Sequence, residues 1–555
     1  MPSPVLIYLW SLYLLSPVKY TLFLLLLSIM LIYIPDSGGS GVALPYNLAF
    51  IAWLGITFFV QAQNNLTQQP RCQQLLLWGS LFLLIPWLTQ THVISGAGVL
   101  LVALLFWQGL QHLSFTSRYR RTILVAVFVL ALGQTTVSLL QVFCPPLAMR
   151  LYEYDWLRNH GRPYGIFQQV NLLASFLASG IGCGFLLLMQ QRLRRNVLLC
   201  TAGLSLLTFV LVLNQSRAGA IGALLIVLCL AALLWRQHPA RSAAALTLMI
   251  ISAASAWYIT QHTTVLVNGV PYSLARSYGE STRERWQMLC ITWHMIMLHP
   301  WAGWGYGTFE YAFSRFVLAH PEYGFISAVV ITHPHNELLY AWFQGGVVAL
   351  SGMLLLFAGW VKIVMSAWRQ GRMQTGYALL IIPLLVHLNL EYPFYQSFVH
   401  FGLFILLLRL GAIDKPHSQI LRAGVGLRIA IGAAAAALMA FSLTALYAGY
   451  QLTMFERGHL ANFPRPAPWY FALQGERAEF DENVSRLIDY NRTHNSADLD
   501  TFMSWAARYS LRHNDKNVWQ SMIVITQYKG DTAAAARLRA QYNRLFPVVQ
   551  TSDSP

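Results

Sequence analysis

The sequence predicts an all-α protein that crosses a membrane many times, and three observations support this fold class. First, 56% of the 555 residues are hydrophobic and only 10% are charged, whereas soluble proteins carry about 25% charged residues. Second, apolar runs close to the ~20 residues that a helix needs to cross a bilayer recur through the first 450 positions. Third, Lys and Arg cluster between alternate runs. A large soluble core would need far more polar surface.

About thirteen spans are predicted, each from an apolar run of roughly bilayer length. In chain order they cover 17–34, 45–62, 73–90, 93–113, 122–143, 165–189, 196–213, 217–236, 242–262, 336–361, 375–391, 396–410 and 427–450. The spans divide the chain into an N-terminal transmembrane bundle (1–262), a long loop (263–335), C-terminal transmembrane helices (336–450) and a helical C-terminal domain (451–555).

The net charge is +16, and the distribution of the Lys and Arg residues along the chain indicates membrane topology and not a nucleic-acid-binding surface. If the spans alternate in direction, every basic cluster falls on one side of the membrane. The clusters contain Arg118, Arg120, Arg121, Arg192, Arg194, Arg195, Arg236, Arg241, Lys362, Arg369, Arg372, Arg409, Lys415, Arg422 and Arg428. Because loops rich in Lys and Arg stay in the cytoplasm, we expect a cytoplasmic N-terminus. The loop 263–335 and the C-terminal domain then lie on the outer side.

Two segments of the outer side are predicted to form helices. The stretch "RERWQMLCITWHMIMLHP" (283–300) is amphipathic and is expected to lie on the membrane face or against the bundle, ending at Pro300. The glycine-rich turn "WAGWGYGTF" that follows is not a nucleotide-binding loop, since no strand precedes it. The polar tail 451–555 indicates two or three helix pairs, which either bind peptides as a short repeat or only pack against the bundle.

The six cysteines show no metal-binding spacing. Only Cys144 and Cys290 fall in outer segments, where they could form a disulfide. Two buried thiols are the favoured interpretation, because unpaired cysteines usually behave as small hydrophobic residues.

Four groups of polar residues at outer span ends are not explained by the topology rule. They are Gln168, Gln169 and Asn171; Ser216 and Arg217; Arg276, Arg283 and Arg285; and His333, His335, Asn336 and Glu337. Taken singly, each has a structural interpretation, such as a helix cap, a snorkelling side chain or a contact between helices. Because all four groups gather on one face of the membrane, a functional site is favoured.

Arginine and histidine at helix N-termini predict a binding site for a diphosphate. The forked guanidinium matches phosphate oxygens, and a helix N-terminus adds partial positive charge. Arg217 and His335 both occupy such positions. At the outer membrane surface, the fitting anion is the pyrophosphate of a polyprenyl carrier that presents a glycan. A histidine, with its pKa of about 6.5, can take the proton of an attacking hydroxyl. The pattern therefore predicts glycosyl transfer, and without a DxD-type acidic cluster in the outer loops we expect neither metal nor cofactor.

Three motifs together resemble the superfamily of O-antigen ligases, O-antigen polymerases and bacterial O-linked protein oligosaccharyltransferases. "NQSRAGAIG" is similar to its Ser-Arg turn. "RWQMLCITWHMIMLHPWAGWGYGTF" resembles its arginine, helix and His-Pro-x-x-Gly-x-Gly segment, and "HPHNELLYAWFQGG" resembles its His-Asn motif with a glycine pair. The motifs cover roughly residues 165–361 in the family's order. The combination is specific, whereas each motif alone is weak.

The resemblance implies functional roles for three residues of this chain. His335 corresponds to the catalytic histidine, which acts either as a base or as an orienting donor, and Arg217 and Arg285 correspond to the pyrophosphate ligands. Arg285 fits the family's distance to His299 and Pro300 better than Arg283 does. The candidate supporting residues on the same face are Gln169, Asn171, Ser216, Arg283, His333 and Asn336.

The segment "GRPYGIFQQVNLLASFL" and the polar tail are similar to the branch that glycosylates proteins, although Val170 stands where that branch often has proline. This resemblance implies a bacterial inner-membrane enzyme with a periplasmic site. It would transfer an oligosaccharide from a polyprenyl-pyrophosphate carrier to Ser or Thr of a periplasmic protein such as pilin. The alternatives are transfer to lipid A–core and glycan polymerisation. A lipid-linked sugar transporter is disfavoured, because no internal repeat is evident and the polar groups gather at one surface.

Overall fold

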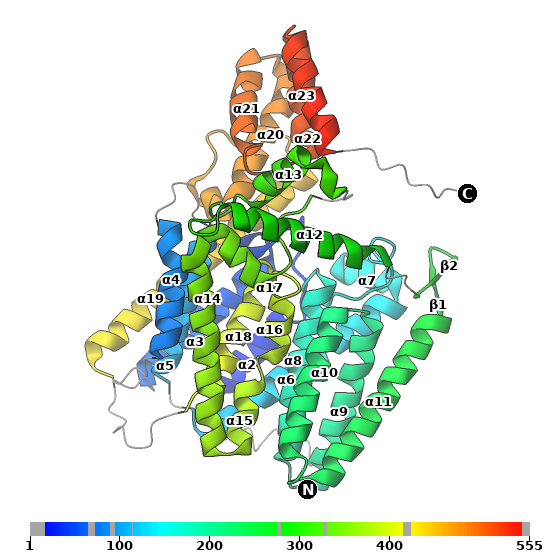
Figure 1. Cartoon of the computed structure of the whole chain (residues 1–555), viewed down its shortest axis with the longest axis vertical. Helices are drawn as coiled ribbons and strands as arrows, with labels where there is room; N and C mark the ends of the chain where they lie inside the picture. The colour runs from blue at the N-terminus through cyan, green and yellow to red at the C-terminus, as the bar shows by residue number, and fades with distance from the viewer. Residues whose placement is uncertain are drawn as a thin grey trace.

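The computed structural model describes residues 17–64, 73–88, 95–113, 115–275, 279–325, 330–413 and 423–546. A large bundle of helices carries a smaller group of helices at one end (Figure 1). Eight helices of the described part are long and apolar enough to cross a bilayer, and shorter apolar helices pack among them. The predicted all-α membrane fold is therefore confirmed.

The bundle contains the helices that correspond to the predicted spans. They are α2 (Pro17–Ile29), α3 (Pro45–Asn64), α4 (Gln74–Leu88), α5 (Ser95–Gln111), α6 (Ser117–Phe143), α8 (Val170–Met189), α9 (Arg194–Leu213), α10 (Arg217–Leu234), α11 (Pro239–His262), α14 (Glu337–Gln370), α15 (Arg372–Leu379), α16 (Ile382–Leu388), α18 (Phe398–Gly411) and α19 (Val425–Arg457). The single span expected at 375–391 consists of two short helices, α15 and α16.

The remaining elements lie in the outer segments and the tail. They are the 3-10 turn η2 (Gly41–Ala43), α7 (Pro145–Tyr152), strands β1 (Thr264–Val267) and β2 (Val270–Ser273), α12 (Gly279–Leu298), α13 (Phe309–Ala319), η3 (Pro321–Tyr323), α17 (Pro393–Gln396), η4 (Trp469–Gln474), α20 (Glu476–Thr493), α21 (Ser496–Tyr509), α22 (Lys516–Tyr528) and α23 (Thr532–Leu545). The predicted amphipathic helix 283–300 is α12, which begins earlier and ends two residues before Pro300. The tail forms two helix pairs, α20–α21 and α22–α23.

Helix α8 lies at the centre of the bundle, and its apolar window is completely buried. It packs against α6, α9, α10 and α16. Small residues make this close packing possible: a Cβ atom added at Gly180 would lie 2.4 Å from the Cβ of Ala131, and one at Gly184 would lie 2.4 Å from the Phe128 ring. Membrane helices commonly approach one another through such small residues. The central position of α8 fixes its first turn, which faces the site described below.

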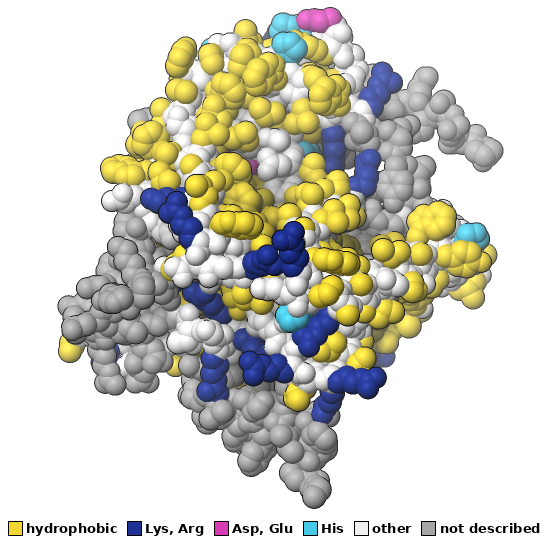
Figure 2. Space-filling view, turned by 60° about the horizontal axis from the view of Figure 1, so that its bottom comes forward, with side chains coloured by type: hydrophobic (Ala, Val, Ile, Leu, Met, Phe, Trp, Pro, Cys, Tyr) yellow, Lys and Arg dark blue, Asp and Glu magenta, His cyan; other side chains and the backbone are white. Residues whose placement is uncertain are grey.

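One end of the bundle is basic. Arginine and lysine side chains lie on or next to the helix ends that meet there, including Arg118, Arg194, Arg241, Lys362 and Arg372. These helices are α6, α9, α10, α11, α14 and α15. Figure 2 shows this end turned toward the viewer, with dark-blue Lys and Arg side chains gathered on it. Lys415 and Arg422 of the predicted clusters lie outside the described residues. We call this the basic end, and the end that bears α12 and the tail helices the opposite end.

The opposite end contains two features outside the predicted spans, a β-hairpin and helix α12. Strands β1 and β2 form an antiparallel hairpin whose turn, Asn268–Gly269, has positive φ at both residues, as two-residue hairpin turns require. Helix α12 crosses the top of the bundle (Figure 1).

Among the described cysteines, Cys144 and Cys290 are free thiols, and Cys144 is exposed. The expected burial of both thiols is wrong: Cys290 is only partly buried, and the α6–α7 junction places Cys144 at the surface.

Candidate active site

A buried carboxylate, Glu391, is the centre of a polar network at the opposite end. It follows α16 in the chain, and its side chain is only 4% exposed. The carboxylate accepts hydrogen bonds from the Arg285 guanidinium and, at 3.0 Å, from the Asn171 amide. Its second oxygen lies 3.0 Å from Nδ1 of His335. Residues from four separate parts of the chain therefore meet at one carboxylate.

The charge of Glu391 is stabilised by these partners. Burial alone would raise the pKa of the Glu391 carboxyl, but the adjacent His335 and the positive charge of Arg285 outweigh burial and hold it below its usual value. The group is therefore an anion at neutral pH. An anion beside Nδ1 of His335 favours the tautomer that carries its proton on Nδ1, which leaves Nε2 as an acceptor.

Asn171 connects Glu391 to the turn that precedes α10. The hydroxyl of Ser216 donates to the Asn171 side-chain oxygen at 2.6 Å. The same hydroxyl caps α10 by accepting from the backbone N–H of Gly219 at 3.3 Å. Arg217 is the first residue of α10, and its side chain is exposed. The predicted cap role of Ser216 and its place in the network are therefore compatible, and Arg217 lies one residue from the network.

His335 is held in an unusual backbone conformation just before α14. Its φ is +55°, in the left-handed region that residues other than glycine rarely adopt. Asn336 follows as the N-cap of α14, since its side-chain oxygen accepts from the N–H of Leu339 at 3.0 Å. The His335 side chain remains 25% exposed. One ring nitrogen thus meets Glu391 while part of the ring can still be reached from outside.

His333 has a different environment from His335. Its ring stacks on Tyr392, with centroids 3.9 Å apart and planes inclined by 10°. Burial, together with the neighbouring charge of His335, lowers the pKa of His333 to about 3. A neutral imidazole stacked on Tyr392 supports the loop that carries His335.

Arg285 reaches the network because the loop after α12 docks onto a break in α14. The break lies at Gly345 and Gly346, which have non-helical backbone angles. The freed carbonyls of Phe343 and Gln344 accept hydrogen bonds from the N–H groups of Trp304, at 2.7 Å, and Gly305, at 3.0 Å. The glycine-rich turn therefore satisfies the backbone groups that the broken helix leaves open.

Gly346 permits this docking. Its φ is +61°, and a Cβ atom added there would lie 1.9 Å from the carbonyl oxygen of Trp301. No side chain fits such a gap. The glycine pair and the glycine-rich turn recognised in the sequence are therefore two halves of one contact, and this contact holds the end of α12 against α14.

The remaining predicted residues lie around this network or away from it. Gln169 caps α8 by accepting from the N–H of Leu172 at 2.7 Å. Gln168 points elsewhere and donates to Asp36 at 2.7 Å. Arg283 is exposed on α12, whereas Arg285 contacts Glu391. Arg276 lies outside the described residues.

Sequence reasoning missed Glu391, although a signal was present. The residue ends the predicted span 375–391, and an ionisable side chain at the end of an apolar span is itself a functional indication. A single carboxylate that collects cations from distant segments matches neither an acidic pair nor a DxD-type cluster.

Comparison with known proteins gives matches in two parts of the chain. Residues 202–354 match the family described as O-antigen ligase, and residues 375–553 match the family described as virulence factor membrane-bound polymerase, C-terminal. An O-antigen ligase of Salmonella typhimurium is 30% identical over 172 residues, which cover 30% of this chain and 40% of that protein. The first match contains Arg217, Arg285 and His335, and the second contains Glu391.

Proposed function

The chain belongs to the O-antigen ligase superfamily, and on this premise we propose that it is an inner-membrane oligosaccharyltransferase. It moves a preassembled oligosaccharide from a polyprenyl-pyrophosphate carrier to Ser or Thr hydroxyls of a periplasmic protein such as pilin. The basic end faces the cytoplasm, and the Glu391 network faces the periplasm, where both substrates are presented.

The observation that carries the proposal is the carboxylate of Glu391 bound by both Arg285 and His335. A histidine oriented by a carboxylate is suited to take a proton, because the carboxylate fixes the tautomer and stabilises the imidazolium. The adjoining helix α10 presents its N-terminus and Arg217, which provide positive charge for an anion. One site therefore offers a base and an anion-binding group side by side.

In the proposed reaction, the acceptor hydroxyl oxygen forms a bond to the anomeric carbon of the first sugar. The bond between that carbon and the pyrophosphate oxygen breaks, and the electron pair leaves with the lipid pyrophosphate. The hydroxyl proton goes to Nε2 of His335. Arg217 and Arg285 neutralise the negative charge that grows on the leaving pyrophosphate, which is where fixed donors lower the barrier most. Guanidinium groups take the place that a divalent cation holds in other glycosyltransferases, so we propose a metal-independent transfer.

A protein acceptor is favoured by the C-terminal domain. The tail forms two helix pairs at the opposite end, close to the outer segments that surround the site (Figure 1). The helical tail also fits the resemblance to the protein-glycosylating branch. Transfer to lipid A–core is the second candidate, because the matched Salmonella protein bears the name O-antigen ligase.

The proposal is tested with purified protein, a lipid-pyrophosphate oligosaccharide and two acceptors, pilin and lipid A–core. We expect the mass of pilin to rise by one oligosaccharide. His335→Ala should abolish this shift, while His320→Ala, which alters another outer-side histidine, should not. Glycosylation of lipid A–core alone would identify a ligase. A normal pilin shift with His335→Ala would disprove the role of the histidine.

A further inference from the structure

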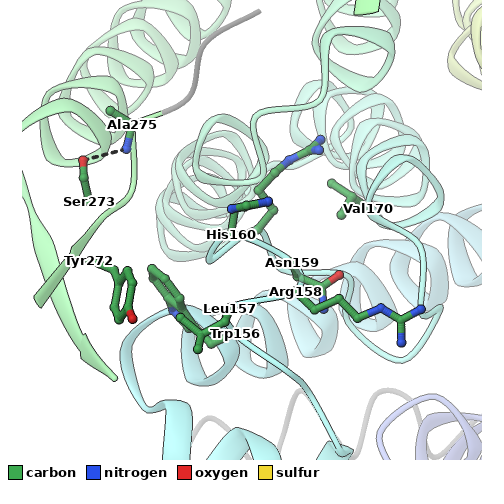
Figure 3. A pocket seen from close by; sticks show the side chains of 10 residues that line it. Trp156, Leu157, Arg158, Asn159, His160, Val170, Tyr272, Ser273 and Ala275 are labelled. Carbon is green, nitrogen blue, oxygen red and sulfur yellow. Dashed lines mark hydrogen bonds between the residues drawn. The ribbon is translucent and has the colours of Figure 1, made fainter. Parts of the chain in front are cut away.

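A cavity of about 730 Å³ lies beside the α10 turn, outside the Glu391 network. Its size is within the range of about 300–1,000 Å³ that is typical of ligand sites. The ten lining residues come from the loop after α7, the start of α8, strand β2 and the segment just after β2, and they include Trp156, Arg158, His160, Arg162 and Tyr272. Figure 3 shows this cavity from close by.

The cavity is joined to the Arg217 turn by direct hydrogen bonds. The guanidinium of Arg162 donates to the carbonyl of Asn214 at 3.2 Å. Gln215 donates to the carbonyl of Leu274, directly after β2, at 2.8 Å. The residues between Asn214 and Arg217 are thus held from one side by the cavity wall and from the other by Asn171. The turn that carries Arg217 therefore adjoins the cavity wall.

The lining has the chemistry of a sugar-binding site. Trp156 and Tyr272 lie with ring centroids 5.9 Å apart, and Figure 3 shows them side by side. The Trp156 indole is only 4% exposed and is fixed by its hydrogen bond to the carbonyl of Val142 at 3.0 Å, so it is a rigid support for Tyr272 and offers little of its own face to a ligand. Tyr272 is 37% exposed. An exposed aromatic face such as that of Tyr272 buries the apolar C–H surface of a sugar ring, and the polar groups around it bind hydroxyls.

The charge of the lining selects the kind of sugar. Arg158 and Arg162 are cations, and none of the ten lining residues is acidic. The Arg158 side chain is exposed, so its charged end is available to a ligand. A guanidinium group binds a carboxylate through two parallel hydrogen bonds. The cavity is therefore complementary to a glycan that carries negative charge.

We propose that this cavity binds the glycan of the lipid-linked donor, with Arg158 recognising an acidic sugar and Tyr272 packing against a sugar ring. The proposal rests on the proposed function, because it takes the pyrophosphate to lie at Arg217. It adds a determinant of donor specificity that is separate from the Glu391 network.

The test uses two donors with the same polyprenyl pyrophosphate and the same number of sugars, one acidic and one neutral. The variants are Arg158→Gln, Tyr272→Ala and, as a control, Arg150→Gln, which alters an exposed arginine of α7 outside the cavity. Thermal unfolding of each purified full-length variant establishes that it is folded. We expect Arg158→Gln to raise KM for the acidic donor by about tenfold with kcat unchanged, and to leave the neutral donor within about twofold. Tyr272→Ala should raise KM for both donors.

A binding measurement separates this proposal from the proposed function. Titration calorimetry with the free acidic oligosaccharide requires no transfer. If the wild-type protein transfers nothing but binds this oligosaccharide more tightly than Arg158→Gln does, the cavity proposal stands and the proposed function fails. If transfer proceeds and Arg158→Gln changes neither KM nor binding, the cavity proposal is overturned. An equal rise in KM for both donors with Arg158→Gln would overturn its role in recognising acidic sugars.

Discussion

At the scale of single residues, the site depends on how a buried carboxylate is kept charged. A carboxylate buried without partners is strongly destabilised, and it becomes neutral instead. Glu391 avoids this outcome because Arg285, Asn171 and His335 all contact it. The same contacts orient Arg285 and His335, so the electrostatic requirement of one buried group fixes the geometry of the proposed catalytic groups.

Replacing the Glu391 carboxylate by an amide hardly changes the size of the side chain, but it is expected to lower kcat strongly. The Glu391→Gln side chain cannot stabilise an imidazolium and no longer fixes the tautomer of His335, so we expect kcat to fall by about 10²-fold to 10⁴-fold. The measurement is the initial rate of pilin glycosylation at saturating donor. Glu284→Gln, on the exposed part of α12, is the matched control. An unchanged kcat for Glu391→Gln would limit Glu391 to a packing role.

The arginines are expected to act through their shape as well as their charge. A lysine keeps the positive charge but loses the planar fork that binds two oxygens at once. We therefore expect Arg217→Lys and Arg285→Lys each to reduce kcat/KM by at least about tenfold, because each variant loses one hydrogen bond to a charged group. Arg283→Lys serves as the control on the same helix as Arg285. Full activity of Arg217→Lys would show that a point charge is sufficient there.

At the scale of elements, the position of α12 depends on the break in α14. The face of α12 that carries Met288, Ile291 and Met295 is buried against Phe343 of α14. Exposed tryptophans, Trp286, Trp293 and Trp301, lie on α12 and directly after it. The helix thus packs one face against the bundle and directs large amphipathic rings outward, as expected for a helix at a membrane interface.

Gly346→Ala is expected to disrupt this docking. The added Cβ would overlap the Trp301 carbonyl, and positive φ adds strain, so we expect a loss of roughly 3 kcal/mol or more in the free energy of unfolding. Transfer activity should fall as well, since Arg285 loses its support. Gly324→Ala is an informative control, because Gly324 has a φ of +55° but open space around it. Equal effects of the two substitutions would argue against the steric explanation.

At the scale of the whole molecule, an ion cluster connects the tail to the rest of the protein. Nδ1 of His513 lies 3.2 Å from Glu310 of α13, and its Nε2 lies 3.2 Å from Glu476 of α20. The backbone N–H of Asn514 donates to the same Glu310 carboxylate at 2.6 Å. Burial alone would lower the pKa of His513, but the two carboxylates outweigh burial and raise it to about 9.

This raised pKa predicts how the docking of the tail depends on pH. His513 gains its proton more readily in the folded state, so its contribution is complete below its unfolded pKa of about 6.5. The contribution is lost as the pH rises through about 9. We expect His513→Ala to remove up to about 3 kcal/mol of stability at pH 6 and much less at pH 10. Hydrogen exchange in α13 and α20 measures this difference, with His494→Ala as the control. A pH-independent effect would contradict the ion-pair explanation.

The sequence by itself determined the elements of the membrane bundle and the end at which its polar chemistry gathers. Both follow from local physical rules: a span needs a long apolar run, and Lys and Arg remain on one side. The motifs around Arg217, Arg285 and His335 were also evident, because each is continuous in the chain. The β-hairpin was not predicted, although its Asn268–Gly269 turn is a local signal for one.

Only the tertiary structure decided which residues meet. Glu391 lies 220 residues from Asn171 and 106 from Arg285 in the chain, so no local pattern relates them. The structure also distinguished His335, which meets this carboxylate, from the stacked His333 two residues earlier. It connected the glycine pair of α14 to the turn after α12. The physical reason is the same in each case: buried charges and open backbone groups must find partners, and folding brings those partners from distant segments.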